Sequence, residues 1–249
     1  NEKVTLSGNT SVADANTISS KTTGVVTATI SEGDVSTLKT LSESTNKFTI
    51  TLTESSVAVA DLNTINGLTT VAVNATAINT LTGGAAAMNT AYTAAGNGEI
   101  SNLGNEAITL DDTSLAVATL NTLNGNTTGV VNAATINTLT GGAAAMNTAY
   151  TANTDGEISG LANEAITLDD TTLAATVLNT LDGNTTGVVN AATVNTLTGA
   201  AGHVITSYTA DGNGTISGLG NEALTLSGNT SVANANTLAA ETSGVITAT

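Results

Sequence analysis

Three segments of the chain carry oxygen-bearing side chains around a glycine, as calcium-binding loops do. They are TAAGNGEIS (93–101), TANTDGEIS (151–159) and TADGNGTIS (209–217). Calcium prefers oxygen ligands, and a glycine among them permits the sharp turn that such a loop needs. The segments therefore predict weak calcium sites. The candidate ligands are Asn97, Asn153, Asp155, Asp211 and Asn213.

The same three segments also fit tight turns that hold no metal. The bidentate glutamate of an EF-hand has no counterpart, because its position holds Gly104, Ala162 or Gly220. Glu106 lies two residues too late for that position. Asn-Gly and Asp-Gly form tight turns by themselves. A turn is therefore the favoured interpretation, and calcium binding is the alternative.

Few other residues offer catalytic chemistry. The carboxylate pairs Asp111-Asp112 and Asp169-Asp170 could act as acid and base, as in glycosidases. Each pair also precedes an expected helix, whose positive N-terminal end acidic residues stabilise. The chain has one histidine, His203, and no cysteine, so no nucleophilic triad is expected. We interpret the pairs as helix caps and predict that the chain is not an enzyme.

Threonine and asparagine in alternating strands form another candidate surface. If the strands stack in register, one outward rank consists of Thr5, Thr27, Thr49, Asn74, Thr109, Asn132, Thr167, Asn190, Thr225 and Thr247. The rank two residues later is interrupted by Asp111 and Asp169. Such an array resembles the ice-binding faces of some β-solenoid antifreeze proteins. The alternative is an ordinary solvated strand face, for which threonine is well suited.

A tandem repeat supplies the elements that would position these side chains. Blocks 47–104, 105–162 and 163–220 follow one another at a constant period, and 221–249 echoes 1–29. A fixed period is typical of a solenoid, in which each unit buries its apolar face against its neighbours. Because the two ends are in phase, we expect the chain to be a window of a longer array.

Within the blocks, the pattern switches between strand and helix periods. Val26–Ile30 and Ile108–Leu110 alternate β-branched and polar residues, which predicts half-buried strands. Residues 115–125 follow cap residues and have the wider apolar spacing of a helix. Gly125 and Gly129 are expected to end that helix with positive φ. The unit is therefore strand, cap, short helix and glycine turn.

The spacing of the first strands predicts the length of one coil. Val4, Val26 and Phe48 are evenly spaced, each twenty-two positions after the one before. Residues 157–168 instead leave about eight residues between two strands, too few for a helical crossover, and predict a tight corner. The core is expected to use small aliphatic side chains between coils. Examples are Leu120, Leu123, Val130 and Leu139.

These patterns predict an α/β repeat solenoid. Parallel short strands stack along one face, and short helices or turns lie opposite. A pure parallel β-helix is the alternative, because threonine and asparagine have modest helix propensity. Residues 1–249 are expected to form a single elongated solenoid.

The charge balance excludes several classes of partner. The chain has 4 basic residues, all lysine, and 20 acidic residues, for a net charge of −16. Nucleic acids and anionic membranes are bound through Lys and Arg, so neither is an expected partner. An apolar run of about 18 residues does not occur in the sequence, so no membrane insertion is expected.

Several phrases resemble a known kind of repeat. TTGVVTATIS (22–31), LNTLDGNTTG (178–187) and ISGLGNEA (216–223) are similar to the Thr/Asn/Ala-rich repeats of giant secreted surface proteins of bacteria, cyanobacteria in particular. The resemblance covers essentially the whole chain. It implies an extracellular or cell-surface location and a structural role, and it supplies no catalytic residues.

The expected function is thus a structural, non-enzymatic segment of a filament, adhesin stalk or surface layer. Such a segment would associate with copies of itself or with neighbouring repeats. The alternative is a solenoid that binds ice, calcium or a glycan through its polar strand face.

Overall fold

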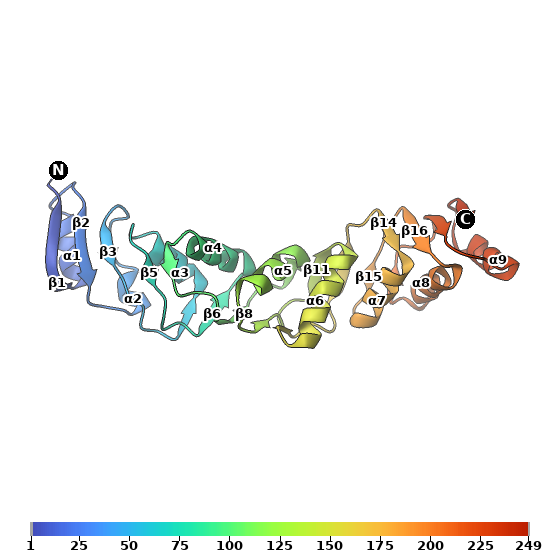
Figure 1. Cartoon of the computed structure of the whole chain (residues 1–249), viewed down its shortest axis with the longest axis horizontal. Helices are drawn as coiled ribbons and strands as arrows, with labels where there is room; N and C mark the ends of the chain where they lie inside the picture. Colours follow the sequence, from blue (N-terminus) through green and yellow to red (C-terminus); the bar gives the residue numbers. More distant parts are fainter. Residues whose placement is uncertain (1, 249) are drawn as a thin grey trace. The chain divides into compact units, whose positions relative to one another are not determined.

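The computed structural model describes residues 2–248 as an α/β chain. Short strands and helices alternate along it from the blue N-terminal residues to the red C-terminal residues (Figure 1). The helices of the described part are α1 (Val12–Ser19), α2 (Val35–Leu38), α3 (Val59–Asn66), α4 (Ala85–Gly96), α5 (Val117–Asn126), α6 (Ala143–Asp155), α7 (Ala175–Asn184), α8 (Ala201–Asn213) and α9 (Val232–Glu241). The α/β class is confirmed, and the pure β-helix alternative is wrong because these helices are present.

The chain forms two compact units, and the first consists of Asn1–Asp111 with Thr122–Asn132. Its strands form parallel sheets in the orders β1-β2-β3, β4-β6-β8-β10 and β5-β7. These strands are β1 (Val4–Thr10), β2 (Val26–Ile30), β3 (Lys47–Thr49), β4 (Ser56–Ala58), β5 (Val73–Asn74), β6 (Thr80–Gly83), β7 (Ile100–Ser101), β8 (Ala107–Leu110) and β10 (Val131–Asn132).

The second unit consists of Asp112–Asn121 with Ala133–Thr249. It holds parallel sheets in the orders β9-β11-β13-β15-β17 and β14-β16-β18-β19. Its strands are β9 (Ser114–Ala116), β11 (Thr138–Gly141), β12 (Ile158–Ser159), β13 (Ala165–Leu168), β14 (Thr172–Ala174), β15 (Val189–Asn190), β16 (Thr196–Gly199), β17 (Ile216–Ser217), β18 (Ala223–Leu226) and β19 (Ile246–Ala248). Helices α7 and α8 contact each other, and so do α8 and α9.

The pairing register gives the length of each coil, meaning the stretch of chain from one strand to the parallel strand beside it. Ser114 pairs with Thr138, and Thr138 pairs with Ala165, so one coil is twenty-four positions long and the next is twenty-seven. These two coils leave seven positions of each repeat block. Seven positions also separate Ile158 of β12 from Ala165 of β13, where the expected corner lies. The coil length expected from the first strands holds at the beginning, where Val4 pairs with Val26.

The core consists of small aliphatic side chains, as expected, but the prediction is wrong for one of the four named residues. Leu120, Leu123 and Leu139 are fully buried. Val130 is 45% exposed, and its neighbour Val131 is buried in its place. The strand β10 begins at Val131 and alternates from there, so the inward and outward positions are reversed relative to the prediction.

Two local predictions about the helix at 115–125 are wrong. Ser114–Ala116 is strand β9, which pairs with β11, and α5 begins only at Val117. Gly125 lies inside α5, and neither Gly125 nor Gly129 has a positive φ. The TLTG run (138–141) of β11 supplies the partner strand that draws residues 114–116 into a sheet.

The predicted rank of threonine and asparagine is correct only in pairs. Thr5 pairs with Thr27 and Thr109 with Asn132, as predicted. Thr49 instead pairs with Thr29, a shift of two residues that keeps threonine on the same face. The further predicted pairs Thr167 with Asn190 and Thr225 with Thr247 are present. Strands β6, β11 and β16 separate these pairs into different ladders. Thr249, which is predicted to end the rank two residues later, lies outside the described residues.

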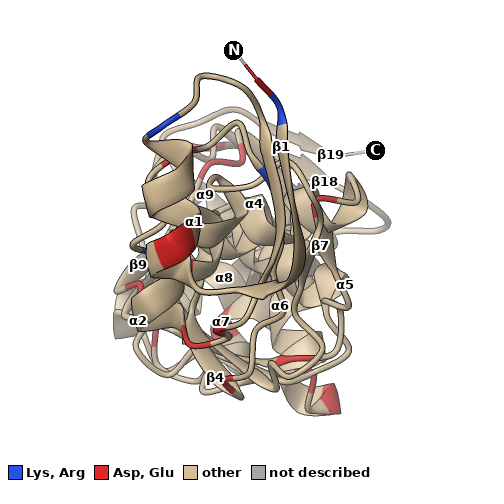
Figure 2. Ribbon diagram, turned by 90° about the vertical axis from the view of Figure 1, so that its left-hand side faces the viewer, with Lys and Arg blue, Asp and Glu red and all other residues tan. Residues whose placement is uncertain are grey.

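Charge is distributed unevenly along the chain. Acidic residues (red in Figure 2) occur throughout, whereas the lysines (blue) all lie within 1–47. One ion pair of the described part joins Lys39 to Asp61 at 2.8 Å. Within residues 2–248, no helix combines the length and the apolar character that crossing a membrane requires.

Candidate functional site

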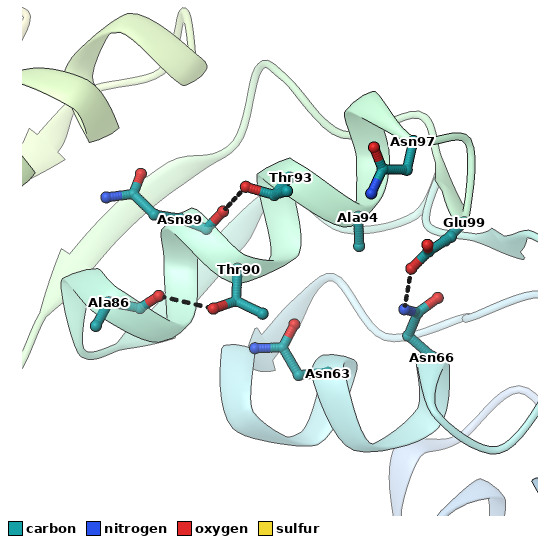
Figure 3. A pocket seen from close by; sticks show the side chains of 9 residues that line it. All are labelled: Asn63, Asn66, Ala86, Asn89, Thr90, Thr93, Ala94, Asn97 and Glu99. Atoms are coloured by element: carbon teal, nitrogen blue, oxygen red, sulfur yellow. Dashed lines mark hydrogen bonds between the residues drawn. The ribbon is translucent and has the colours of Figure 1, made fainter.

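A groove of about 420 Å³ lies between α3 and α4 in the first unit (Figure 3). Its lining is rich in amides and hydroxyls. The lining residues are Asn63, Asn66, Ala86, Asn89, Thr90, Thr93, Ala94, Asn97 and Glu99. Helical spacing places them together, because residues three or four apart share one helix face. The chemistry that the groove offers is therefore hydrogen bonding to a polar ligand.

Several polar groups of the groove are already used within the protein. The Thr90 hydroxyl donates to the Ala86 carbonyl at 3.0 Å, and the Thr93 hydroxyl donates to the Asn89 carbonyl at 2.7 Å. The Asn66 amide donates to the Glu99 carboxylate at 3.3 Å (Figure 3). These bonds reduce the capacity of the groove to recognise a ligand.

One groove residue makes a hydrogen bond between successive helices that recurs along the chain. The Asn63 amide donates to the Ala87 carbonyl of the next helix at 2.9 Å. In the second unit, Asn121 donates to the Ala145 carbonyl and Asn179 to the His203 carbonyl, both at 2.9 Å. These asparagines all stand in the phrase that reads LNT. Asn63 therefore connects successive helices, which is a structural use of the side chain.

The most buried polar cluster is one that sequence reasoning missed. Glu106, Glu164 and Glu222 are 0% exposed. Each carboxylate accepts a hydrogen bond from a tyrosine hydroxyl fourteen residues earlier. The three pairs are Tyr92 with Glu106 at 3.1 Å, Tyr150 with Glu164 at 2.8 Å and Tyr208 with Glu222 at 2.9 Å. The signal is present in the sequence, because the three tyrosines of the chain all occupy the same phase of the repeat block.

Each of these glutamates also holds the corner before the next strand. Glu164 accepts the Ala162 N–H at 3.1 Å, and Glu222 accepts the Gly220 N–H at 2.9 Å. Glu106 accepts the Gly104 N–H at 2.9 Å, but its Oε1 has no hydrogen-bond partner among the described residues. A buried carboxylate needs such partners, because it has lost its hydration. The three glutamates therefore fasten helices α4, α6 and α8 to the residues that lead into β8, β13 and β18.

The tyrosines are neutral in this arrangement. Burial raises the pKa of Tyr92, Tyr150 and Tyr208 above the ordinary value of 10.0, and the adjacent glutamate raises it further. The hydroxyl of a neighbouring threonine partly offsets the increase in the tyrosine pKa. The hydroxyl thus remains a donor to the carboxylate throughout the neutral range.

A threonine and a glycine complete each cluster. The Thr185 hydroxyl donates to the Glu164 carbonyl at 2.9 Å and accepts the Gly187 N–H at 2.9 Å. A Cβ on Gly187 would lie 2.1 Å from that carbonyl oxygen. Thr127 and Gly129 make the same arrangement with the Glu106 carbonyl in the first unit. The glycine after GNTT is therefore required for close approach between coils, not for a helix end.

The acidic pair Asp169-Asp170 does cap a helix, but not the one predicted. The Asp170 carboxylate accepts the N–H of Ala143, the first residue of α6, at 2.7 Å. Helix α6 belongs to the preceding coil. Glu32 caps Val12 of α1 and Glu54 caps Val35 of α2 in the same backward manner. The prediction that each pair caps the following helix is wrong, because strands β9 and β14 follow the pairs.

The predicted calcium ligands lie at the C-terminal ends of helices. Asn97 follows the end of α4, and Asp155 and Asn213 are the last residues of α6 and α8. Gly156 and Gly214 then have φ of 83° and 81°, which only glycine adopts easily, and they end these helices. The segments are thus helix ends with a glycine turn.

Two of the five candidate ligands already bind backbone. The Asn153 side chain accepts the Leu161 N–H at 3.1 Å, and Asp211 accepts the Leu219 N–H at 3.2 Å. Across the described chain, acidic, histidine and cysteine side chains nowhere gather in a group of three that could hold a metal ion. Calcium binding stays a prediction.

His203 lies exposed on α8, where its backbone carbonyl accepts the hydrogen bond from the Asn179 amide. Its imidazole therefore stands apart from the buried clusters.

Comparison with protein-family models, curated proteins and solved structures gives no match.

Proposed function

We propose that the chain is a structural repeat segment of a secreted or cell-surface protein, such as a filament, an adhesin stalk or a surface layer. The observation that carries this proposal is that one buried cluster recurs at the repeat period. In each copy a tyrosine donates a hydrogen bond to a buried glutamate, beside a threonine and a glycine. In each copy the phenol donates to the carboxylate, and the carboxylate also accepts a backbone N–H. Repeated use of ionisable groups in this way favours a scaffold over a reaction centre.

The same proposal includes the continuous solenoid. Parallel pairing of β9 with β11 and of β11 with β13 within the second unit supports stacking of successive coils. The recurrent asparagine and threonine bonds support the same arrangement. High acidity with small polar surface residues keeps long chains soluble and mutually repelling, which suits an extracellular array.

Small-angle X-ray scattering of the dilute monomer tests the proposal. A continuous solenoid is expected to give a radius of gyration well above the value of about 18 Å for a compact chain of this length. A radius of gyration near that compact value would contradict it. Unfolding by urea should also lack a single steep transition, because stability in repeat stacks is a sum of neighbour interactions.

A further inference from the structure

The C-terminal end of α4 borders a second hollow of the first unit, with a volume of about 430 Å³. Ala95 and Gly96 of the last turn of α4 line it, together with Leu103 of the loop that follows β7. It shares no lining residue with the groove between α3 and α4, so the two surfaces are distinct. We call it the α4 hollow.

In the other two repeat blocks, a longer polar side chain stands at the position of Ala95. The second block has Asn153 there, and the third block has Asp211. The Asn153 Oδ1 accepts the Leu161 N–H at 3.1 Å, and its Nδ2 donates to the Leu161 carbonyl at 3.2 Å. The Asp211 Oδ1 accepts the Leu219 N–H at 3.2 Å. In both blocks the end of the helix thus binds the leucine of the loop that follows.

The first block lacks this bond, because Ala95 has no polar side-chain atom. Leu103 is the corresponding leucine, and within residues 2–248 no hydrogen bond pairs its N–H or its C=O. Leu103 is partly buried, and backbone groups that turn away from water need a partner. Gly96 stands where the second block has Thr154, which leaves further room beside the leucine. Both backbone groups of Leu103 are therefore available to a ligand.

The side chain of Asn153 shows which chemical group fits these two backbone groups. Its primary carboxamide presents an N–H and a C=O on one edge, and they meet the C=O and N–H of Leu161. A carboxylate has no donor and satisfies only the N–H, as Asp211 does. A trans secondary amide directs its N–H away from its C=O. A neutral ligand is also favoured because the chain has a net charge of −16.

Asn102 adds a polar side chain to the α4 hollow that the other blocks lack. Within residues 2–248 it is the one non-glycine residue with a positive φ, at 65°, whereas Gly160 and Gly218 stand at this place with φ of 90° and 89°. Such a conformation costs free energy when a side chain is present, and it is often retained at ligand sites. The Asn102 amide donates to the Asn74 Oδ1 at 3.0 Å, which leaves its own Oδ1 to accept a hydrogen bond from a ligand.

We propose that the α4 hollow binds a primary carboxamide, with the N–H and C=O of Leu103 as its two hydrogen-bonding partners. The first block thus receives from a ligand the group that the second block carries as Asn153. The carboxamide belongs either to a small molecule or to a glutamine or asparagine side chain of a peptide. This binding site goes beyond the proposed structural function and does not depend on it.

Nuclear magnetic resonance of the ¹⁵N-labelled chain tests the site, with propionamide as the probe. The amide signal of Leu103 should shift on titration, with a Kd of about 10 mM for two neutral hydrogen bonds. Propionate lacks the donor, and N-methylpropionamide directs it away, so each should bind about tenfold more weakly. An unshifted Leu103 signal at about 100 mM propionamide, or equal shifts with all three probes, would overturn the proposal.

Matched variants test whether the hollow itself recognises the probe. Ala95→Asn supplies the side chain of the second block, so Leu103 should lose its response to propionamide and its amide should exchange more slowly with solvent. The double variant Asn153→Ala with Thr154→Gly should give Leu161 the response that Leu103 has in the wild type. An Ala95→Asn protein whose Leu103 signal shifts as in the wild type would overturn the proposal.

A short peptide separates the two sources of the carboxamide. If Gly-Gly-Gln-Gly-Gly binds at least about tenfold more tightly than propionamide, the site recognises a peptide side chain. Equal affinity of the peptide and propionamide would assign the site to small carboxamides. Failure of every probe would leave the scattering of the dilute monomer unchanged, so the proposed structural function stands or falls separately.

Discussion

Helices α1 and α9 have almost the same sequence but are buried to different extents. Val12 of α1 is 2% exposed, and Val232 of α9 is 78% exposed. The difference arises because residues 30–52 follow α1 and cover it, with Glu32 on the Val12 N–H. In this chain, burial of a coil is thus decided by the coil that follows it as much as by its own residues.

Other features of the two coils are the same. The Thr22 hydroxyl donates to the Glu2 carbonyl at 2.7 Å, and the Thr242 hydroxyl donates to the Glu222 carbonyl at 2.7 Å. A Cβ on Gly24 or Gly244 would meet the same carbonyls at 2.2 and 2.1 Å. These ties lie inside the coil, and they form whether or not another coil follows. The comparison therefore separates what a coil does alone from what its neighbour adds.

The largest expected difference between the two helices comes from a buried charge. Val12→Asp places a carboxylate at a buried position beside the Glu32 carboxylate. We expect it to destabilise the first coil by about 4 kcal/mol, which is about a thousandfold in amide exchange of α1. Val232→Asp should change the exchange of α9 by less than about 0.5 kcal/mol, because the side chain is exposed. Equal effects of the two substitutions would break the comparison.

Alkaline pH should affect the last coil first. The raised pKa of the three tyrosines means that their contribution to stability is complete below pH 10.0. It is lost as the pH rises above that value through the folded-state pKa. Because α9 is little buried, we expect Tyr208, which holds the start of that coil, to ionise before Tyr92 and Tyr150.

Absorbance at about 295 nm reports tyrosinate cleanly, since the chain has no tryptophan. The early part of the titration should disappear in Tyr208→Phe and persist in Tyr150→Phe. Simultaneous ionisation of all three tyrosines near pH 10 in folded protein would contradict the buried arrangement.

Removing one tyrosine hydroxyl tests whether a single hydrogen bond contributes equally to an inner coil and to the last coil. Tyr150→Phe deletes the 2.8 Å bond to the buried Glu164 carboxylate. Bonds to charged groups contribute about 1.5–3 kcal/mol, so native-state amide exchange of α6 should show a loss of that size. Tyr208→Phe should weaken the last coil comparably, since its bond of 2.9 Å to Glu222 does not involve a following coil. A loss confined to Tyr150→Phe would show that this tie also depends on the neighbour.

The smallest effect is expected from a cap that α1 receives from the following coil. Glu32→Ala removes the carboxylate from the Val12 N–H while Ser11 still caps Asp14. We expect a loss of about 1 kcal/mol, seen as faster exchange of the first amides of α1. The control Glu43→Ala removes an exposed carboxylate of the same coil and should leave α1 unchanged. An equal effect of both variants would assign the loss to net charge.

Much of the fold could be predicted from the sequence, because the repeat and the strand period are local signals. The strand at Val26–Ile30 and the corner at 157–168 are examples. Strand β9 is not predicted because LAVATL fits a helix, and only the partner β11 makes Ser114–Ala116 a strand. The prediction for Val130 is wrong because two adjacent valines leave the strand face ambiguous by one residue.

The buried site was less predictable than the fold, because its contacts join residues that are far apart in the sequence. The Tyr–Glu pairs join residues fourteen apart, a spacing that matches neither a helix turn nor a strand alternation. The backward caps of Asp170 and Glu32 reach across 27 and 20 residues, so they follow from coil length alone. The sequence pointed to Asp169-Asp170 as a cap but to the wrong helix, and Glu32 was not predicted to cap any helix.

Amide hydrogen exchange of α1 and α9 in the dilute wild-type protein tests most directly whether each coil is stabilised by the one that follows. The two helices have nearly equal intrinsic exchange rates, because their sequences nearly match. We predict that α1 is protected at least about tenfold more than α9 at concentrations where the protein is monomeric. Equal protection of the two helices would contradict the claim that the following coil stabilises this chain.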